Sequence, residues 1–342
     1  MDRKEPDFGR IKKAIRGEKP DRTPYLEFWI GNQPLQEQVL GRRIPGPPIN
    51  FYNNPLPAAL NVEFATKTGM DGVVIDYIYR PNTVGKILDD GSENYMTGNI
   101  KGWDDLKNLE EPLPYDFLRK KIEEHVRAIE GTKLKIAHTF TGVLDPVYLA
   151  MGLTDFMYKV ADDMRFVETL MDIFLARAMR AINIALEYDE VEMFLINDDI
   201  AHSKALFLKP SLMEKIWYPR IKVMAGAVKS RGKILAYHTD GCITDAIPML
   251  LDMGFDAVHP VEPYGNDIYA LKSACGDRIT FIGNIEIGML ESGTEEEIRK
   301  DVKNHIGRLA YNSRYIVSSS NSITTKVPYK NFMAMIDTVL YS

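Results

Sequence analysis

The sequence predicts an α/β fold, a (β/α)8 TIM barrel in which eight strand–helix units close into a ring. Three observations predict it. Eight short apolar segments follow one another, helical stretches separate them, and 342 residues suffice for one large barrel. Continuous apolar strands are typical of a parallel sheet that is covered on both faces. An open, doubly wound sheet shows the same alternation, so the sequence leaves barrel closure open.

The eight predicted strands share a run of apolar residues bounded by turn-forming residues. They are 23–28, 72–76, 134–140, 193–198, 233–238, 257–262, 279–285 and 314–318. The clearest predicted helices are 117–129, 155–187, 211–230, 243–253 and 295–310. Thr294 and Glu297 have the spacing of a capping box, and Gly232 and Gly254 each follow the end of a predicted helix.

We find no internal repeat and no linker, and therefore expect residues 1–342 to form a single barrel domain. Irregular segments are expected at about 1–22 and 31–57, the second of which contains several prolines. An Asp-Gly turn near 86–99 predicts a β-hairpin inserted after the second strand.

Composition and charge exclude several classes of protein. The net charge is −6, so nothing suggests binding to nucleic acid. Cys242 and Cys275 form no CxxC pair, which fits a reducing compartment. The N-terminal segment has no apolar signal region, and no apolar run reaches the length of a membrane span. We expect a cytoplasmic protein without a membrane partner.

Polar side chains gather where the predicted strands end, and in a barrel of this type these ends carry the chemistry. We expect His238, Asp240 and Asp76 to be catalytic, because His238 and Asp240 can face one side of an extended segment and Asp76 closes an apolar strand. The substrate-binding candidates share positions at or just after strand ends: Glu27, Trp29, Tyr77, Tyr79, Asp198, Asp199, His202 and Tyr237.

Structural roles compete with these interpretations. Asp198 and Asp199 fit equally well as caps of a helix or loop. His138 and His259 fit better as hydrogen-bonded core histidines than as ligands. The chain has no GxGxxG after a strand, no Walker loop and no GxSxG elbow, so the corresponding nucleotide-dependent enzymes and hydrolases are not expected.

In the order of its motifs the chain resembles the uroporphyrinogen decarboxylase superfamily over nearly its full length. The segments that carry the resemblance are KPDRTP (19–24), the hairpin after strand two, NDDIA (197–201) with LKPSLMEKIWYPRIK after it, YHTDGCITDAIPMLLDMGFDAVHPVEP (237–263), GDRITFIGNIE (276–286) and VPYKNFMAMI (327–336). This superfamily contains the decarboxylase itself and corrinoid-linked methyltransferases, all on (β/α)8 barrels.

The decarboxylase branch typically holds its substrate carboxylates with arginines at the end of strand one. The corresponding stretch here, 26–34, contains Glu27 and no arginine, which is the wrong chemistry for an anionic tetrapyrrole. Asp76 nevertheless resembles the catalytic aspartate of that branch.

The methyltransferase branch has a zinc site formed by His-x-Cys after strand five and a cysteine near strand eight. By this resemblance the histidine falls on His238, the first cysteine on Asp240 and the second near Asn321, so both thiolates are replaced. Oxygen and nitrogen ligands suit a harder Lewis acid. The resemblance and the strand ends together suggest a metal set of His238, Glu262, Glu286 and Asn321, with zinc as the candidate ion.

The leading hypothesis is a methyltransferase that moves a methyl group from a small donor, such as a methoxylated aromatic, to a Co(I) corrinoid (a cobalamin) on a partner protein. Trp29, Tyr77, Tyr79 and Tyr237 would form an aromatic wall for the donor. The resemblance also suggests a homodimer. The alternatives are a uroporphyrinogen decarboxylase-like decarboxylase and a non-catalytic barrel that binds a ligand or partner.

Overall fold

A computed structural model describes residues 5–46, 49, 55–78, 80–87 and 93–342. Its central sheet has seven parallel strands in the order β1-β4-β5-β8-β9-β10-β11. These strands are β1 (Val73–Tyr77), β4 (Ile136–Thr141), β5 (Val191–Asn197), β8 (Ile234–Thr239), β9 (Ala257–Pro260), β10 (Thr280–Ile282) and β11 (Tyr315–Ile316). They coincide with seven of the eight strands that the sequence predicts.

The eighth predicted strand, 23–28, lies between the two edge strands. Tyr25 forms a parallel bridge with Val317, next to β11, and its carbonyl accepts the N–H of Asp71, just before β1. The segment is too sparsely paired to form a regular strand, partly because Pro24 has no N–H to donate. These bonds curl the sheet into a TIM-barrel-like ring, so the predicted fold class is confirmed.

Two long predicted helices are each broken in the structure. The predicted helix 155–187 consists of α6 (Leu153–Asp162) and α7 (Met164–Ala185), because Asp163 caps α7 by accepting the N–H of Phe166. The predicted helix 211–230 consists of α8 (Pro210–Ile216) and α9 (Tyr218–Lys229). The break precedes Pro219, which supplies no N–H to the helical ladder.

The other predicted helices differ less. The helix predicted at 243–253 is the shorter α10 (Ile247–Asp252), and α13 (Glu295–Leu309) starts with the predicted capping box of Thr294 and Glu297. The remaining helices are α1 (Gly9–Arg16), α2 (Gln33–Leu40), α3 (Ala58–Thr68), η1 (Trp103–Asn108), α4 (Tyr115–Ala128), α5 (Asp145–Met151), α11 (Ile268–Cys275), α12 (Ile287–Ser292), η2 (Ala310–Asn312) and α14 (Tyr329–Leu340).

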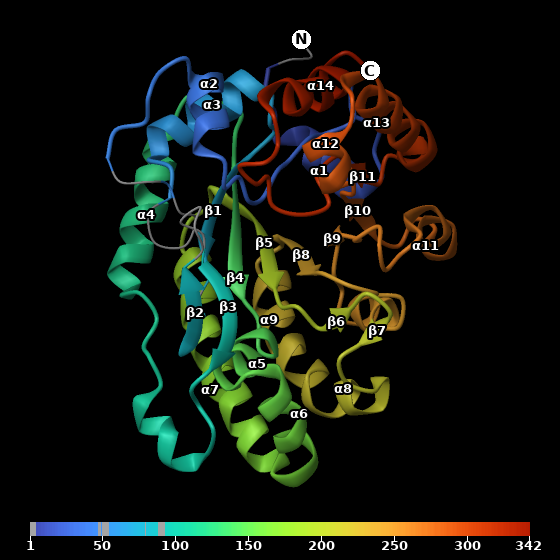
Figure 1. Ribbon diagram of the computed structural model, residues 1–342. Helices are drawn as coiled ribbons and strands as arrows, with labels where there is room; N and C mark the ends of the chain where they lie inside the picture. The colour runs from blue at the N-terminus through green and yellow to red at the C-terminus, as the bar shows by residue number, and fades with distance from the viewer. Residues whose placement is uncertain (1–4, 47–48, 50–54, 79, 88–92) are drawn as a thin grey trace.

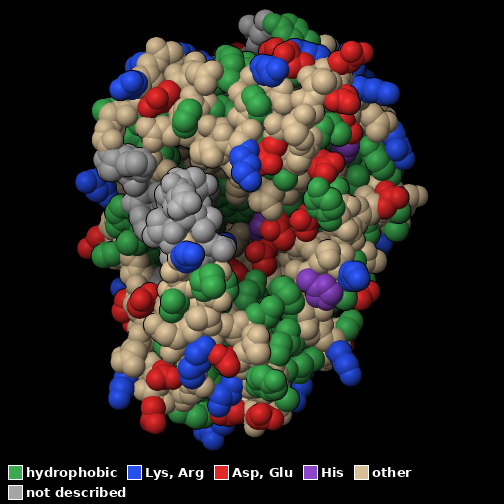
Figure 2. Space-filling model, in the orientation of Figure 1, with side chains coloured by type: hydrophobic (Ala, Val, Ile, Leu, Met, Phe, Trp, Pro, Cys, Tyr) green, Lys and Arg blue, Asp and Glu red, His purple; other side chains and the backbone are tan. Residues whose placement is uncertain are grey.

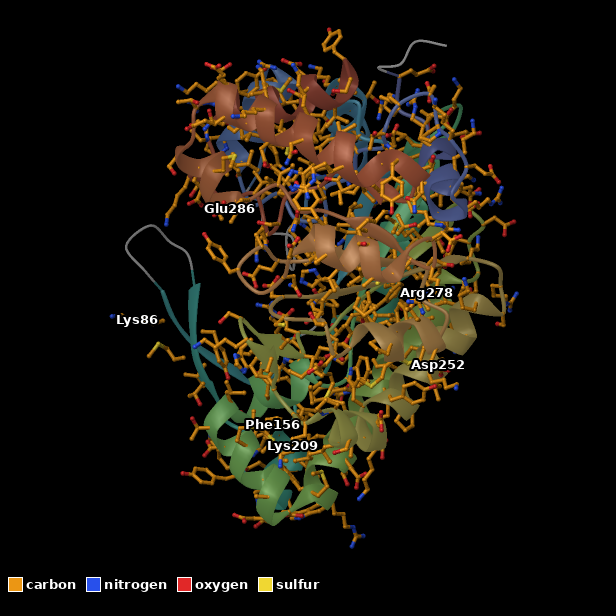
Figure 3. The ribbon with its side chains drawn as sticks, turned by 90° about the vertical axis from the view of Figure 1, so that its right-hand side faces the viewer. Lys86, Phe156, Lys209, Asp252, Arg278 and Glu286 are labelled. Atoms are coloured by element: carbon orange, nitrogen blue, oxygen red, sulfur yellow. The ribbon has the colours of Figure 1, made fainter. Side chains whose placement is uncertain are left out.

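Helices surround the sheet, with α4 on one side and α12 to α14 on the other (Figure 1). Two antiparallel hairpins are added: β2 (Thr83–Ile87) with β3 (Glu93–Gly98), and β6 (Ala201–His202) with β7 (Ala205–Leu206). The first occupies the place of the predicted insertion, packs against α5 and stands out from the body in Figure 3. Strands β1, β4 and β8 are buried throughout, so polar groups at their ends are poorly hydrated.

Within the described part of the chain, no helix combines the length and the apolar character that a membrane crossing requires.

Candidate active site

The carboxyl ends of the strands surround a hollow in which acidic side chains gather (Figure 2). At its centre, Asn197 of β5, His238 of β8 and His259 of β9 occupy partnered positions on neighbouring strands. Side chains at partnered positions of parallel strands point to the same face of the sheet. All three side chains are buried, so this layer places two imidazoles and an amide inside the barrel.

Three ligand-type side chains converge at the end of β8. His238, Asp199 and Asp240 each offer one atom, and the three atoms lie within 4.8 Å of one another. The Nε2 of His238 is 3.6 Å from Oδ1 of Asp199 and 3.9 Å from Oδ1 of Asp240. Asn321 donates from Nδ2 to Oδ2 of Asp240 at 3.1 Å. The three positions that resemble the zinc ligands of methyltransferases are therefore neighbours in space.

The turn after β8 is held by backbone bonds to two carboxylates. The N–H of Asp240 donates to Oδ1 of Asp199, and the N–H of Gly241 donates to Oε2 of Glu262, both at 2.8 Å. Gly241 has a φ of 81°, and a Cβ there would lie 2.6 Å from the backbone of Ala201. Only glycine fits this turn without strain. Gly241 therefore allows the backbone to turn directly after Asp240, which keeps Asp240 beside His238.

The predicted metal set is therefore only partly brought together. Glu262 bonds the backbone of the turn, and Glu286 accepts the hydroxyl of Tyr264 at 2.7 Å on the rim, where Figure 3 labels it. Asp199 and Asp240 lie next to His238, where Glu262 and Glu286 were expected. Asp199 directly follows β5, so its position depends on how that strand packs against β8.

Burial and mutual repulsion shift the pKa values of the acidic groups. Desolvation, followed by repulsion from Asp199 and Glu262, raises the pKa of Asp240 to about 8. Asp145, at the start of α5, has its pKa raised to about 7 by burial and by the charge of Asp199. Asp240 therefore holds a proton at neutral pH, and can serve as a proton donor.

The histidines are shifted in the opposite direction. Burial lowers the pKa of His238 to about 4 and that of His259 well below its ordinary value. Both rings are therefore neutral, and their Nδ1 atoms lie 2.8 Å apart. Behind His259, Ser318 and the buried carboxylate of Glu27 continue the chain of polar contacts. Burial raises the pKa of Glu27 to about 7.

Asp76 and Trp29 lie on the opposite wall. Oδ1 of Asp76 accepts the indole N–H of Trp29 at 3.0 Å and the hydroxyl of Thr139. Burial raises the pKa of Asp76 to about 6. The ring of Trp29 stands edge-on to His238, with centroids 4.5 Å apart. Among the described residues of the predicted wall, Trp29 is thus the one that reaches the cluster.

Tyr77 and Tyr237, two further residues of the predicted wall, do not line this hollow. The hydroxyl of Tyr77 bonds the carbonyl of Leu113, and its ring packs in the helical layer beside Tyr115. Tyr237 packs between the rings of Trp217 and Phe255. Side chains alternate along a strand, so the neighbours of Asp76 and His238 point outward. Tyr79 lies outside the described residues.

Two further predicted residues have structural or peripheral positions. Asp198 accepts the N–H groups of Leu144 and Asp145 and the indole N–H of Trp217, so it caps α5. This agrees with the alternative of a cap, although the helix is one that precedes Asp198 in sequence. His202 is exposed on the hairpin β6–β7, at the rim.

Three residues of the site were not among the predicted candidates: Asp145, the buried Asn197, and Ser318, which lies between His259 and Glu27. Asp145 precedes a proline at a helix start, which is a weak signal among many such sites. Arg80, which follows β1 in the sequence, contributes a positive charge that opposes the rise in the pKa values of Asp145 and Asp240 and adds to the fall in that of His238.

The cluster fits a metal ion. Among the described residues, Oδ1 of Asp240 is buried and has no hydrogen-bond partner, and it faces Nε2 of His238. One imidazole nitrogen and two carboxylate oxygens form a hard donor set that suits Zn²⁺ or a harder divalent ion. His238, Asp199 and Asp240 would be the ligands, and Asn321 and His259 would orient them.

Comparisons with known proteins place this geometry in a family. Residues 8–340 match the profile described as "Uroporphyrinogen decarboxylase (URO-D)". No curated protein matches the sequence significantly. Among solved structures, a methyltransferase from Methanosarcina mazei aligns with a TM-score of 0.77 and 18% identity, covering 99% of this chain and 100% of that one. The 3-keto-D-glucoside 4-epimerase YcjR from E. coli aligns with a TM-score of 0.51 and 12% identity over 83% and 95%. Since the family profile spans nearly the whole sequence, this chain belongs to the uroporphyrinogen decarboxylase (URO-D) family.

Proposed function

We propose that this protein is a methyltransferase that transfers a methyl group from a small donor, a methoxylated aromatic compound, to a Co(I) corrinoid carried by a partner protein. The observation that carries the proposal is the convergence of His238, Asp240 and Asn321 at the mouth of the barrel. These positions resemble the zinc ligands of the corrinoid-linked branch. The full-length structural similarity to a methyltransferase supports the same branch.

Cleavage of a methyl ether is limited by its leaving group, because an alkoxide or phenolate leaves poorly unless it is protonated or bound to a cation. Asp240 answers this need, since its raised pKa keeps it protonated at neutral pH. His238 stays neutral beside it, and the edge of Trp29 supplies an apolar contact for a ring. Asp240 can supply this proton only in the metal-free site; a zinc ion held by the ionised carboxylate of Asp240 would instead supply a Lewis acid for the leaving oxygen.

Electrostatics disfavour the decarboxylase alternative. The segment 26–34 contributes the buried carboxylate of Glu27 and no arginine, and Asp199, Asp240 and Glu262 crowd the same hollow. A substrate with several carboxylates would be repelled by these groups. Asp76, the residue that resembles the catalytic aspartate of that branch, already accepts bonds from Trp29 and Thr139.

The methyl acceptor would reach the hollow from outside. The described chain is taken up by the barrel and its two hairpins, so we assign the corrinoid to a partner that docks over the mouth. The hairpin β2–β3 and the rim around Glu286 border this mouth on the side that Figure 3 shows at its left.

The test is methyl transfer from a methoxylated phenol to cob(I)alamin, followed by the appearance of methylcobalamin in the absorption spectrum. We expect turnover by the wild type, loss in Asp240→Asn, and no change in Asp252→Asn, which alters an exposed carboxylate on α10. Failure with methoxylated, methylamine and methylthiol donors, together with decarboxylation of uroporphyrinogen, would establish the alternative. Retained binding of a ligand without turnover of either kind would favour a non-catalytic barrel.

A further inference from the structure

We propose that Glu27, Ser318 and His259 form a hydrogen-bond relay that fixes the tautomer of His238 and turns the lone pair of its Nε2 toward Asp199 and Asp240. The relay sets the chemical role of His238 whatever the substrate is, so it stands independently of the proposed methyl transfer.

The first link joins two neutral imidazoles. His238 and His259 are 5% and 2% exposed, and their Nδ1 atoms are 2.8 Å apart. An imidazole in mildly alkaline solution is neutral and carries a single N–H. A bond between the two Nδ1 atoms requires that one ring donates and the other accepts. The geometry allows both directions, so the direction must be set elsewhere.

The carboxylate of Glu27 sets this direction. Its oxygens accept the N–H of Ser319 at 2.8 Å and the hydroxyl of Ser318 at 3.3 Å. The hydroxyl of Ser319 lies 2.6 Å from this carboxylate and 2.7 Å from the carbonyl of Asn321, so these two acceptors share its single proton. An ionised carboxylate only accepts hydrogen bonds. The single hydroxyl proton of Ser318 therefore points to Glu27, and Ser318 can only accept from Nε2 of His259, which lies 3.4 Å away.

The polarity then propagates to the cluster. If Nε2 of His259 carries the proton, its Nδ1 is bare and accepts from Nδ1–H of His238. The Nε2 of His238 is then bare as well. It faces Oδ1 of Asp199 at 3.6 Å and Oδ1 of Asp240 at 3.9 Å, while the edge of Trp29 holds the ring in place.

This tautomer divides the chemical roles at the mouth. A neutral imidazole with a bare Nε2 can bind a cation or accept a proton, but it has no proton to give at that atom. His238 is then the base or metal ligand, and a proton donated at the mouth must come from another group. The same outer-sphere arrangement, in which a ligating histidine donates from its second nitrogen, orients histidines in many metal sites.

The relay operates when Glu27 is ionised. Because the pKa of Glu27 is about 7, this condition is met in solutions above neutral pH. The ionisable groups around this carboxylate are Tyr25 on its own segment, and Asp76, Lys121 and His125, which line a cavity in common with it. The pKa of Tyr25 is raised well above 10, so the tyrosine remains neutral in mildly alkaline solution. Measurements there isolate the ionised form of Glu27.

The first experiment reads the tautomer directly by ¹⁵N NMR of the histidine side chains at mildly alkaline pH, with His238→Gln used to assign the signals. We expect His238 to carry its proton on Nδ1 in the wild type. In Glu27→Gln the side-chain amide donates to a serine hydroxyl, so the hydroxyl of Ser318 becomes free to donate to Nε2 of His259. The proton of His259 then lies on Nδ1 and is donated to Nδ1 of His238, so the proton of His238 should move to Nε2. Ser318→Ala, a milder change, should give a mixture of tautomers. A wild type with its proton on Nε2, or a tautomer unchanged in both variants, would overturn the relay.

A second experiment measures the affinity for Zn²⁺ alone by titration. His259→Leu removes the acceptor of His238 and should weaken Zn²⁺ binding about 10- to 100-fold, the usual loss for an outer-sphere partner. His259→Asn keeps an oxygen near the place of Nδ1 and should restore much of the affinity. His305→Leu removes another buried histidine, bonded to Asn284, and should leave the affinity unchanged. Equal losses in all three variants would show a general structural effect and contradict the relay.

Discussion

The two ends of the barrel treat buried aspartates in opposite ways. Asp71, just before β1, accepts two bonds from Arg22 and one from Arg10, all between 2.7 and 2.9 Å, and the N–H groups of Asp7 and Tyr25 complete its partners. At the carboxyl ends, Asp145 and Asp240 each keep one buried oxygen that no described residue bonds. Buried aspartates are thus fully hydrogen-bonded at the amino end, whereas at the carboxyl end two of them lack a partner for one oxygen.

This contrast shows which end of the barrel contributes stability and which end retains acidic groups that can bind a ligand. A buried carboxylate is tolerated when paired cations and N–H groups satisfy it, as around Asp71. Around Asp240, burial and the neighbouring carboxylates of Asp199 and Glu262 raise its pKa. In barrels of this kind the amino end serves stability and the carboxyl end serves chemistry.

The largest expected effect is on stability at the amino end. Asp71→Ala removes the buried carboxylate that Arg22 and Arg10 share, while Arg10 keeps its ion pair with Asp21, so the free energy of unfolding should fall by about 3–5 kcal/mol. Denaturant unfolding measures it. Asp21→Ala removes a partner of Arg10 that is 37% exposed, and should cost at most about 1 kcal/mol. Similar losses in the two variants would erase the contrast between buried and exposed pairs.

At the carboxyl end the expected loss is in activity instead. Asp240→Asn removes the proposed proton donor and should lower the rate of methyl transfer about 10²- to 10⁴-fold. The denaturation midpoint should hold or rise, because a neutral amide replaces a carboxyl group whose ionised form is disfavoured by burial and by neighbouring carboxylates. Steady-state rates and unfolding curves of the same preparation check both parts. A destabilised variant with full activity would reverse the assignment of the two ends.

Substitutions at the carboxyl end of the barrel should weaken Zn²⁺ binding, and substitutions at the amino end should not. Asp199→Ala removes a candidate ligand and should weaken Zn²⁺ binding by more than the ~10- to 100-fold cost of an outer-sphere partner. Asp21→Ala, at the other end, should bind Zn²⁺ like the wild type. Titration calorimetry compares them, and equal affinities in both variants would show that Asp199 is not a ligand.

The smallest expected effect is in the pH dependence of stability, measured with a chelator present. Asp240 holds its proton more tightly when folded, with a pKa of about 8 against an ordinary 3.8, so the unfolding free energy falls as pH rises through that window. His238 acts oppositely below its ordinary 6.5, because its folded pKa is about 4. Between 6.5 and 8 the decline should therefore be visible, and Asp240→Asn should reduce its slope. An unchanged slope in the variant would mean that Asp240 titrates normally.

Neighbouring residues show how far the sequence could predict the site. Asp198 and Asp199 are equivalent in a sequence pattern, yet one caps α5 and the other faces His238. Tyr237 and His238 are also adjacent, but only His238 points inward. The sequence predicts that side chains alternate along a strand, but the packing of the strand decides which of the two sets faces the barrel interior.

Alone, the sequence determined the alternation of strands and helices, the barrel class and the polar strand ends, because periodicity and turn residues are local properties of the chain. Tertiary structure decided which groups meet. Asp240 and Asn321 are 81 positions apart, and His238 and His259 are 21 apart. Their contacts follow from strand order, and their pKa values follow from burial, and both exist only once the ring has closed and excluded water.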